Sequence, residues 1–192
     1  MSHYLLTVCF KKALLLAGSI FLMSCSSNYQ DYATRQPAFN FTEFFDGQLC
    51  AWGLVRKRDD WVNRKFIASI TAYRQNDTLI LDEIFQFDDG EQQTRVWQFI
   101  QQGNQWIGRA GDVEGRATGI EIGDSLHLTY ALNIPLDDST LTIAMDDWLH
   151  RVDANTVMGS TQMTKWGFEV GSIDIVIQKQ TPNVNYCKFT QR

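Results

Sequence analysis

The sequence predicts an all-β protein that folds into an antiparallel up-and-down barrel of about ten strands. Three observations predict it. Apolar and polar residues alternate through most of the chain after residue 40, which is the pattern of half-buried strands. Short sequences rich in Asn, Asp and Gly separate the alternating segments. The gaps are too short for crossover helices, so neighbouring strands should pair antiparallel.

The clearest strand covers residues 125–134. Its apolar side chains fall at every second position, and the residues between them include His127 and Thr129. Successive side chains of a strand point to opposite faces, so this strand should bury one face and expose the other. The same alternation recurs at residues 66–73, 79–87, 95–100 and 173–178.

The separating sequences carry turn chemistry, because Asn, Asp and Gly tolerate the backbone angles of tight hairpins. A long meander of strands either exposes its two edges or closes on itself, and closure removes the edges. We therefore expect a lipocalin-like barrel, with a short helical turn at residues 41–45 leading into it. The turn sequences lie at residues 75–77, 88–90, 103–104, 123–124 and 137–139.

Other architectures fit the pattern less well. A β-sandwich usually has longer connections between its sheets. An outer-membrane barrel has an apolar outer band, whereas charges here fall on both faces of strands, as at Arg64-Lys65 and Asp82-Glu83. The glycines within residues 108–123 lack the Lys-Ser/Thr ending of a phosphate loop, and we interpret them as bulges and bends of a small barrel.

Residues 1–24 have the form of a lipoprotein signal peptide. Lys11 and Lys12 precede an apolar segment at residues 13–23, which is shorter than the about 20 residues that a membrane-spanning helix needs. Cys25 follows a small residue, so we expect it to be the lipidated N-terminus of the mature protein. Two or more acyl chains on Cys25 would make a stable membrane anchor.

This interpretation predicts three segments and a location. The signal peptide at residues 1–24 is followed by the lipidated cysteine and a polar tether at residues 25–40, and then by the barrel domain at residues 41–192. Ser26 resembles an outer-membrane sorting signal, so we expect a lipid-anchored protein on the periplasmic face of the outer membrane. The acyl anchor makes the membrane a partner.

The composition limits which other partners and cofactors the protein is expected to bind. The formal net charge is −5, and an acidic protein is a poor match for nucleic acid. After removal of the signal peptide only His127 and His150 remain, without the paired spacing of a zinc site. We therefore expect no metal and no cofactor. Export would place Cys50 and Cys187 in an oxidising compartment, where a disulfide and two free thiols both fit the sequence.

Five motifs carry a resemblance to a known family. Together they cover nearly all of the mature chain, and on them the sequence resembles the bacterial lipoprotein family called domain of unknown function 3833. The resemblance implies a lipocalin-like domain on a lipid anchor and implies no activity. The motifs are FFDGQLCAWGLV (residues 44–55), LDEIFQFDDGE (81–91), GRAGDVEGRATG (108–119), MDDWLHRVD (145–153) and MTKWGFEVG (163–171).

Glu83 and Asp147 are the first candidates for function. Each belongs to an acidic pair inside a predicted strand, so one member of each pair should face the barrel interior. A carboxylate on an apolar face must be paired, or it becomes protonated. Three interpretations remain open: an ion pair with a buried arginine such as Arg95, a polar anchor for the head group of a ligand, or general acid–base catalysis.

Aromatic residues should enrich the same interior, where they either fill the barrel or line a slot for an apolar ligand. A serine nucleophile is not supported, because the chain has no Gly-x-Ser-x-Gly sequence, and we assign no catalytic residue. The candidates for ligand binding are Trp52, Glu83, Phe85, Arg95, Trp97, Tyr130, Asp147 and Trp148.

We expect from these observations an envelope lipoprotein whose barrel binds a hydrophobic ligand, such as a fatty acid or lipid. One alternative is an enzyme that modifies a lipid-derived substrate through its interior carboxylates. The other is a structural envelope protein with a filled barrel.

Overall fold

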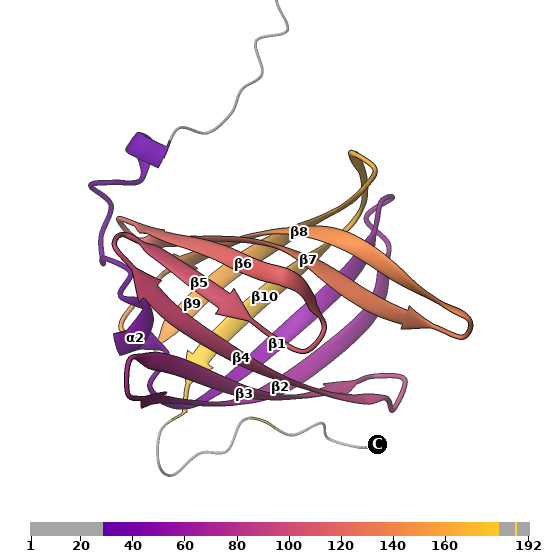
Figure 1. Cartoon of the computed structure of the whole chain (residues 1–192), viewed down its shortest axis with the longest axis horizontal. Coiled ribbons are helices and arrows are strands. Elements are labelled where there is room, and N and C mark those ends of the chain that lie inside the picture. The colour runs from indigo at the N-terminus through magenta and orange to yellow at the C-terminus, as the bar shows by residue number, and fades with distance from the viewer. Residues whose placement is uncertain (1–28, 181–186, 188–192) are drawn as a thin grey trace, which may run out of the picture.

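Ten antiparallel strands close into a barrel in which each strand pairs with its neighbours in the sequence (Figure 1). The last strand returns to pair with the first, so the sheet has no free edge. This confirms the predicted up-and-down barrel. The computed structural model describes residues 29–180 and residue 187. The predicted signal peptide and Cys25 lie outside the described residues.

The elements follow one another with short connections. Two short helical segments, η1 (Tyr29–Asp31) and α2 (Phe41–Phe44), precede the strands. The strands are β1 (Gly47–Lys57), β2 (Val62–Gln75), β3 (Thr78–Phe87), β4 (Gln92–Gln102), β5 (Gln105–Arg109), β6 (Val113–Ile122), β7 (Ser125–Leu136), β8 (Ser139–Arg151), β9 (Thr156–Lys165) and β10 (Phe168–Lys179).

The predicted turns fall between these strands. Gly115 shows why glycine was needed within β6, because its φ of 69° lies in the left-handed region that other residues rarely adopt. The register of β6 against β7 shifts at the same place, between Glu114 and Thr118. A bulge at Gly115 therefore bends the barrel wall, as predicted for the glycines within residues 108–123.

The helix α2 closes one end of the barrel (Figure 1). Asn40 caps it by accepting a hydrogen bond from the backbone N–H of Glu43, and Phe41, Phe44 and Phe45 are all buried. The Phe41 ring packs edge-on against Phe99, with the ring centroids 4.9 Å apart. The predicted helical turn therefore acts as an apolar plug.

The segment before α2 lies against the outer wall from Tyr29 onward, where the sequence predicted a polar tether. The Tyr32 ring stacks on Trp148 with the ring centroids 5.0 Å apart. The Tyr29 hydroxyl lies 2.8 Å from Nδ1 of His127. Residues before 41 therefore contact the barrel, because the aromatic side chains of Tyr29 and Tyr32 pack against its outer wall.

A disulfide joins Cys50 of β1 to Cys187, with a Cα–Cα distance of 5.5 Å. Cys50 is fully buried. The bond fixes the position of Cys187 beside the first strand, and it settles the choice that the sequence left open. None of the helices within the described residues has the length and apolar composition needed to cross a bilayer.

Candidate functional site

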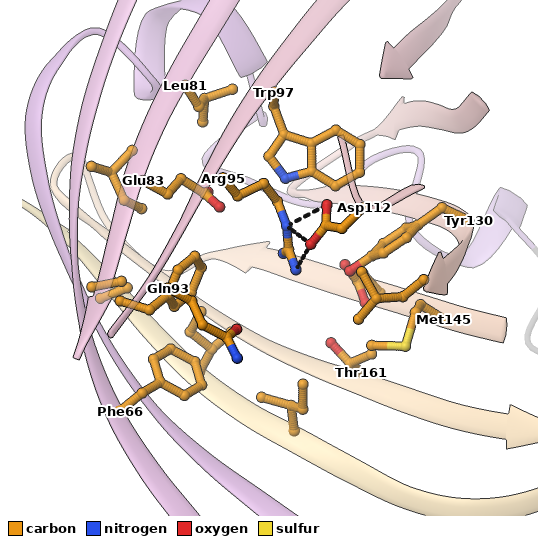
Figure 2. Close-up of a pocket in the computed structure, with 18 of the residues that line it drawn as sticks. Phe66, Leu81, Glu83, Gln93, Arg95, Trp97, Asp112, Tyr130, Met145 and Thr161 are labelled. Carbon is orange, nitrogen blue, oxygen red and sulfur yellow. Dashed lines mark hydrogen bonds and ion pairs between the residues drawn. The ribbon is translucent and has the colours of Figure 1, made fainter. Parts of the chain in front are cut away.

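The barrel is hollow. Its interior holds a cavity of about 560 Å³, lined mainly by aromatic and aliphatic side chains from all around the wall (Figure 2). This volume falls within the roughly 300–1,000 Å³ of small-molecule sites. Of the two interiors that the sequence allowed, filled and hollow, the structure shows the hollow one.

The cavity is closed at one end and reaches the surface at the other. Phe41 and Phe45 of the plug form part of its lining at the closed end. Its lining also includes Glu91, Gln93 and Pro135, which are exposed to solvent near the β3–β4 and β7–β8 hairpins. A ligand could therefore pass between these hairpins without unfolding the barrel.

A polar group interrupts the apolar wall inside this cavity. The group consists of Glu83, Arg95, Asp112, Tyr130, Asp147 and Thr161, and we call it the interior polar group. In a mainly apolar pocket, a few polar side chains of this kind fix the orientation of a ligand.

Arg95 is held by Asp112, a residue that the sequence did not single out. Arg95 Nε donates to Asp112 Oδ2 at 2.9 Å, and an Arg95 terminal nitrogen lies 2.7 Å from the same oxygen (Figure 2). Asp112 lies in the turn between β5 and β6, where its carbonyl accepts a hydrogen bond from the backbone N–H of Asn133. The loop is thereby fixed to β7, which presents the carboxylate to Arg95.

Glu83 lies opposite Arg95 in the register of β3 and β4. It forms no hydrogen bond with any residue that the structure describes. Burial raises the pKa of Glu83 to about 7; the Arg95 charge opposes the rise, and the negative charges of Asp112 and Asp147 add to it. Glu83 is therefore an acid that changes its charge near neutral pH.

Asp147 lies opposite Thr161 in the register of β8 and β9. Burial raises the pKa of Asp147 to about 6, and hydrogen bonding from Thr161 and Tyr130 partly offsets the rise. The pKa of the Tyr130 hydroxyl is raised well above its usual value, chiefly by burial and then by the Asp147 charge. Oδ1 of Asp147 is buried and has no hydrogen-bond partner among the described residues.

The structure places most of the predicted binding residues on the cavity. Phe85, Trp97 and Tyr130 line it together with the charged candidates. Glu83 and Asp147 face inward, as the alternation predicted, because each belongs to the inward-facing set of its strand.

Trp52 and Trp148 do not line this cavity, and their placement inside was wrong. Ala51 and Asp147 face the cavity, and adjacent residues of a strand point to opposite faces. Trp148 instead stacks on His127 at the outer surface, with the ring centroids 4.3 Å apart. Trp52 borders a separate pocket formed by residues of β1, β2, β9 and β10.

The histidines also lie outside the cavity lining. His127 Nε2 lies 2.8 Å from Oδ1 of Asp146 on the outer face. Among the described residues, no group of three or more His, Cys, Asp or Glu side chains is arranged to hold a metal ion.

Comparison with known families decides the affiliation of the chain. Residues 19–179 match the family described as "Protein of unknown function (DUF3833)". The chain belongs to this family. The match confirms the resemblance carried by the five motifs, and it leaves the activity of this DUF3833 protein open. No curated protein matches the sequence.

A solved structure shares the fold of this DUF3833 protein. The S-type phycobiliprotein lyase CPES from Guillardia theta superimposes with a TM-score of 0.50 and 10% sequence identity. The similarity covers 73% of this chain and 92% of that chain. At this identity, the similarity shows a shared barrel fold and carries no residue roles.

Proposed function

We propose that this DUF3833 protein is a lipid-anchored envelope protein whose barrel binds one hydrophobic ligand with a polar head, of the fatty acid or lipid type. The observation that carries the proposal is the cavity of about 560 Å³, apolar along its wall and open at one end. The tail of the ligand would lie along the apolar wall, and the head would contact the interior polar group.

The wall offers enough apolar contact for such a tail. Phe66, Leu81 and Met145 are among the side chains that border the cavity (Figure 2). Moving a methylene group from water into such surroundings contributes about 0.8 kcal/mol. A chain of several methylenes therefore gains more than the cost of ordering it, while a wholly polar ligand would not.

The proposed anchor is Cys25, and it would hold the barrel at a bilayer where such ligands concentrate. Incorporation of radiolabelled palmitate into the protein tests this part. We expect label in the wild type and none in Cys25→Ser. An unlabelled wild-type protein that is nevertheless exported would contradict the anchor and leave ligand binding to be tested separately.

Extraction of the purified protein with organic solvent, followed by mass spectrometry, tests the ligand. We expect about one equivalent of an amphiphile per barrel, since the cavity has the volume of a single small-molecule site. Absence of any bound amphiphile, together with no uptake of an added apolar dye, would contradict a binding function.

A second candidate function is acid–base catalysis on a bound lipid-derived substrate. Glu83 and Asp147 favour it, because burial raises their pKa values to about 7 and about 6, close to the pH at which a general acid or base is most effective. Variants Glu83→Gln and Asp147→Asn separate the two functions: lost turnover with retained binding would favour catalysis.

A further inference from the structure

The charges of the cavity do not balance. Its lining contains two cations, Arg64 and Arg95, within the described residues. Arg64 pairs with Asp89 and Glu91 at the open end, each at 2.6 Å. Arg95 pairs with Asp112. Both cations are therefore matched by carboxylates other than the two deeper acids.

Glu83 and Asp147 are the acids left over. Glu83 forms no hydrogen bond with the described residues, and Asp147 keeps one oxygen unpartnered. Each has apolar neighbours two positions away on the inward face of its strand, Leu81 and Phe85 beside Glu83 and Met145 beside Asp147. An ionised carboxylate in such surroundings costs free energy unless a cation or hydrogen-bond donors reach it.

We propose that the bound ligand carries a protonated amine head, which Glu83 and Asp147 hold, and a single hydrocarbon chain along the apolar wall. This proposal rests on the proposed function, and of the ligand types named there it selects a lipid with an amine head over a free fatty acid. An ammonium group has three donors and a full positive charge. It can donate to the unpartnered oxygen of Asp147, and its charge also acts on Glu83, which lines the same cavity and interacts electrostatically with Asp147.

The aromatic side chains beside the acids suit the same head. Arg95 already lies over the Phe85 and Trp97 rings, 5.5 and 5.9 Å from their centroids. Faces of aromatic rings attract cations, most strongly where water is excluded. The surroundings of Glu83 therefore stabilise positive charge through rings as well as carboxylates.

A ligand with a carboxylate head would be repelled at the same place. It would stand beside two acids, and Nε and one terminal nitrogen of Arg95 already bind Asp112. Repulsion between like charges in a poorly solvated site is strong. The cavity should therefore discriminate against free fatty acids and in favour of amines of equal chain length.

Competition among three ligands with the same chain tests the proposal. The purified protein is loaded with the neutral apolar dye phenylnaphthylamine, and dodecylamine, dodecanol and dodecanoic acid are titrated against it near pH 8. We expect dodecylamine to displace the dye at a concentration at least about tenfold lower than either of the others. Equal or tighter binding of dodecanoic acid would overturn the proposal while leaving the binding function intact. Failure of the dye and all three ligands to bind would instead overturn the proposed function.

Variants of the two interior acids test which residues cause the preference for the amine. We expect Glu83→Gln and Asp147→Asn each to reduce the preference for dodecylamine over dodecanol by at least about threefold. Asp82→Asn is the matched control, because Asp82 neighbours Glu83 but is exposed on the outer face, and it should keep the full preference. An undiminished preference in both interior variants would overturn the assignment. If either variant fails to fold, the comparison of the three ligands in the wild type still tests whether the cavity prefers an amine head.

Discussion

Glu83 and Arg95 lie directly opposite each other on β3 and β4, yet the hydrogen bonds of Arg95 go to Asp112. The buried ion pair that the sequence suggested for Glu83 is therefore replaced by one from a loop. Arg95 still lowers the pKa of Glu83 through its charge, but burial outweighs it. This arrangement leaves an interior acid that a ligand can use.

Removing the charge of Glu83 should stabilise the ligand-free protein at high pH. The folded pKa of about 7 lies above the usual 4.5, so the folded state holds a proton that the unfolded state has lost. Wild-type stability from this group is full below about pH 4.5 and is lost as the pH rises through 7. We expect Glu83→Gln to raise the free energy of unfolding near pH 8 by up to about 2–3 kcal/mol, with little effect near pH 4. Urea unfolding of the wild type and of Glu83→Gln at both pH values measures this difference. A variant that is less stable than the wild type by the same amount at both pH values would contradict the account.

Binding of dodecylamine should strengthen as the pH rises. An alkylamine stays protonated well above neutral pH, like a lysine side chain, whereas Glu83 and Asp147 lose protons with pKa values of about 7 and about 6. Arg95, which pairs with Asp112, keeps its charge over this range because its pKa is raised, and Tyr130 stays neutral. We expect the dissociation constant to fall at least about tenfold between pH 5 and pH 8. A constant affinity over this range would show that neither acid contacts the amine.

The disulfide should contribute to stability through the length of the chain it closes. Cys50 and Cys187 are separated by 137 residues, for which the chain-entropy relation gives about 4–5 kcal/mol. We expect the double variant Cys50→Ala, Cys187→Ala to lose a large part of this in chemical unfolding. The reduced wild type is the matched control and should lose a similar amount. No change in either protein would show that the bond is not formed in solution.

Alternation made most of the fold and part of the site predictable. It predicted the strands, their turns and the inward direction of Glu83 and Asp147, because side chains of a strand change face at every residue. The same rule argues against placing Trp148 inside, since its neighbour Asp147 already faces inward. The aromatic character of Trp148 does not by itself indicate which face of β8 carries it, because aromatic side chains also pack on the outer wall, as Trp148 does against Tyr32.

Other features depend on contacts between distant segments. Asp112 lies in a turn, where no periodicity indicates direction, and its role depends on the approach of Arg95. The hollow interior depends on small side chains at matched positions of neighbouring strands, such as Ala51 opposite Ala68. Composition alone cannot show that these residues face the same space.

Filling the cavity tests the central claim most directly. Ala51 is buried on the cavity wall, whereas Ala144 is exposed on β8, so Ala51→Phe and Ala144→Phe add the same ring inside and outside the barrel. Titration with phenylnaphthylamine should give about one site per chain in the wild type and in Ala144→Phe. We expect Ala51→Phe, folded as judged by circular dichroism, to bind at least about tenfold more weakly. Undiminished binding by folded Ala51→Phe would contradict a ligand site inside the barrel.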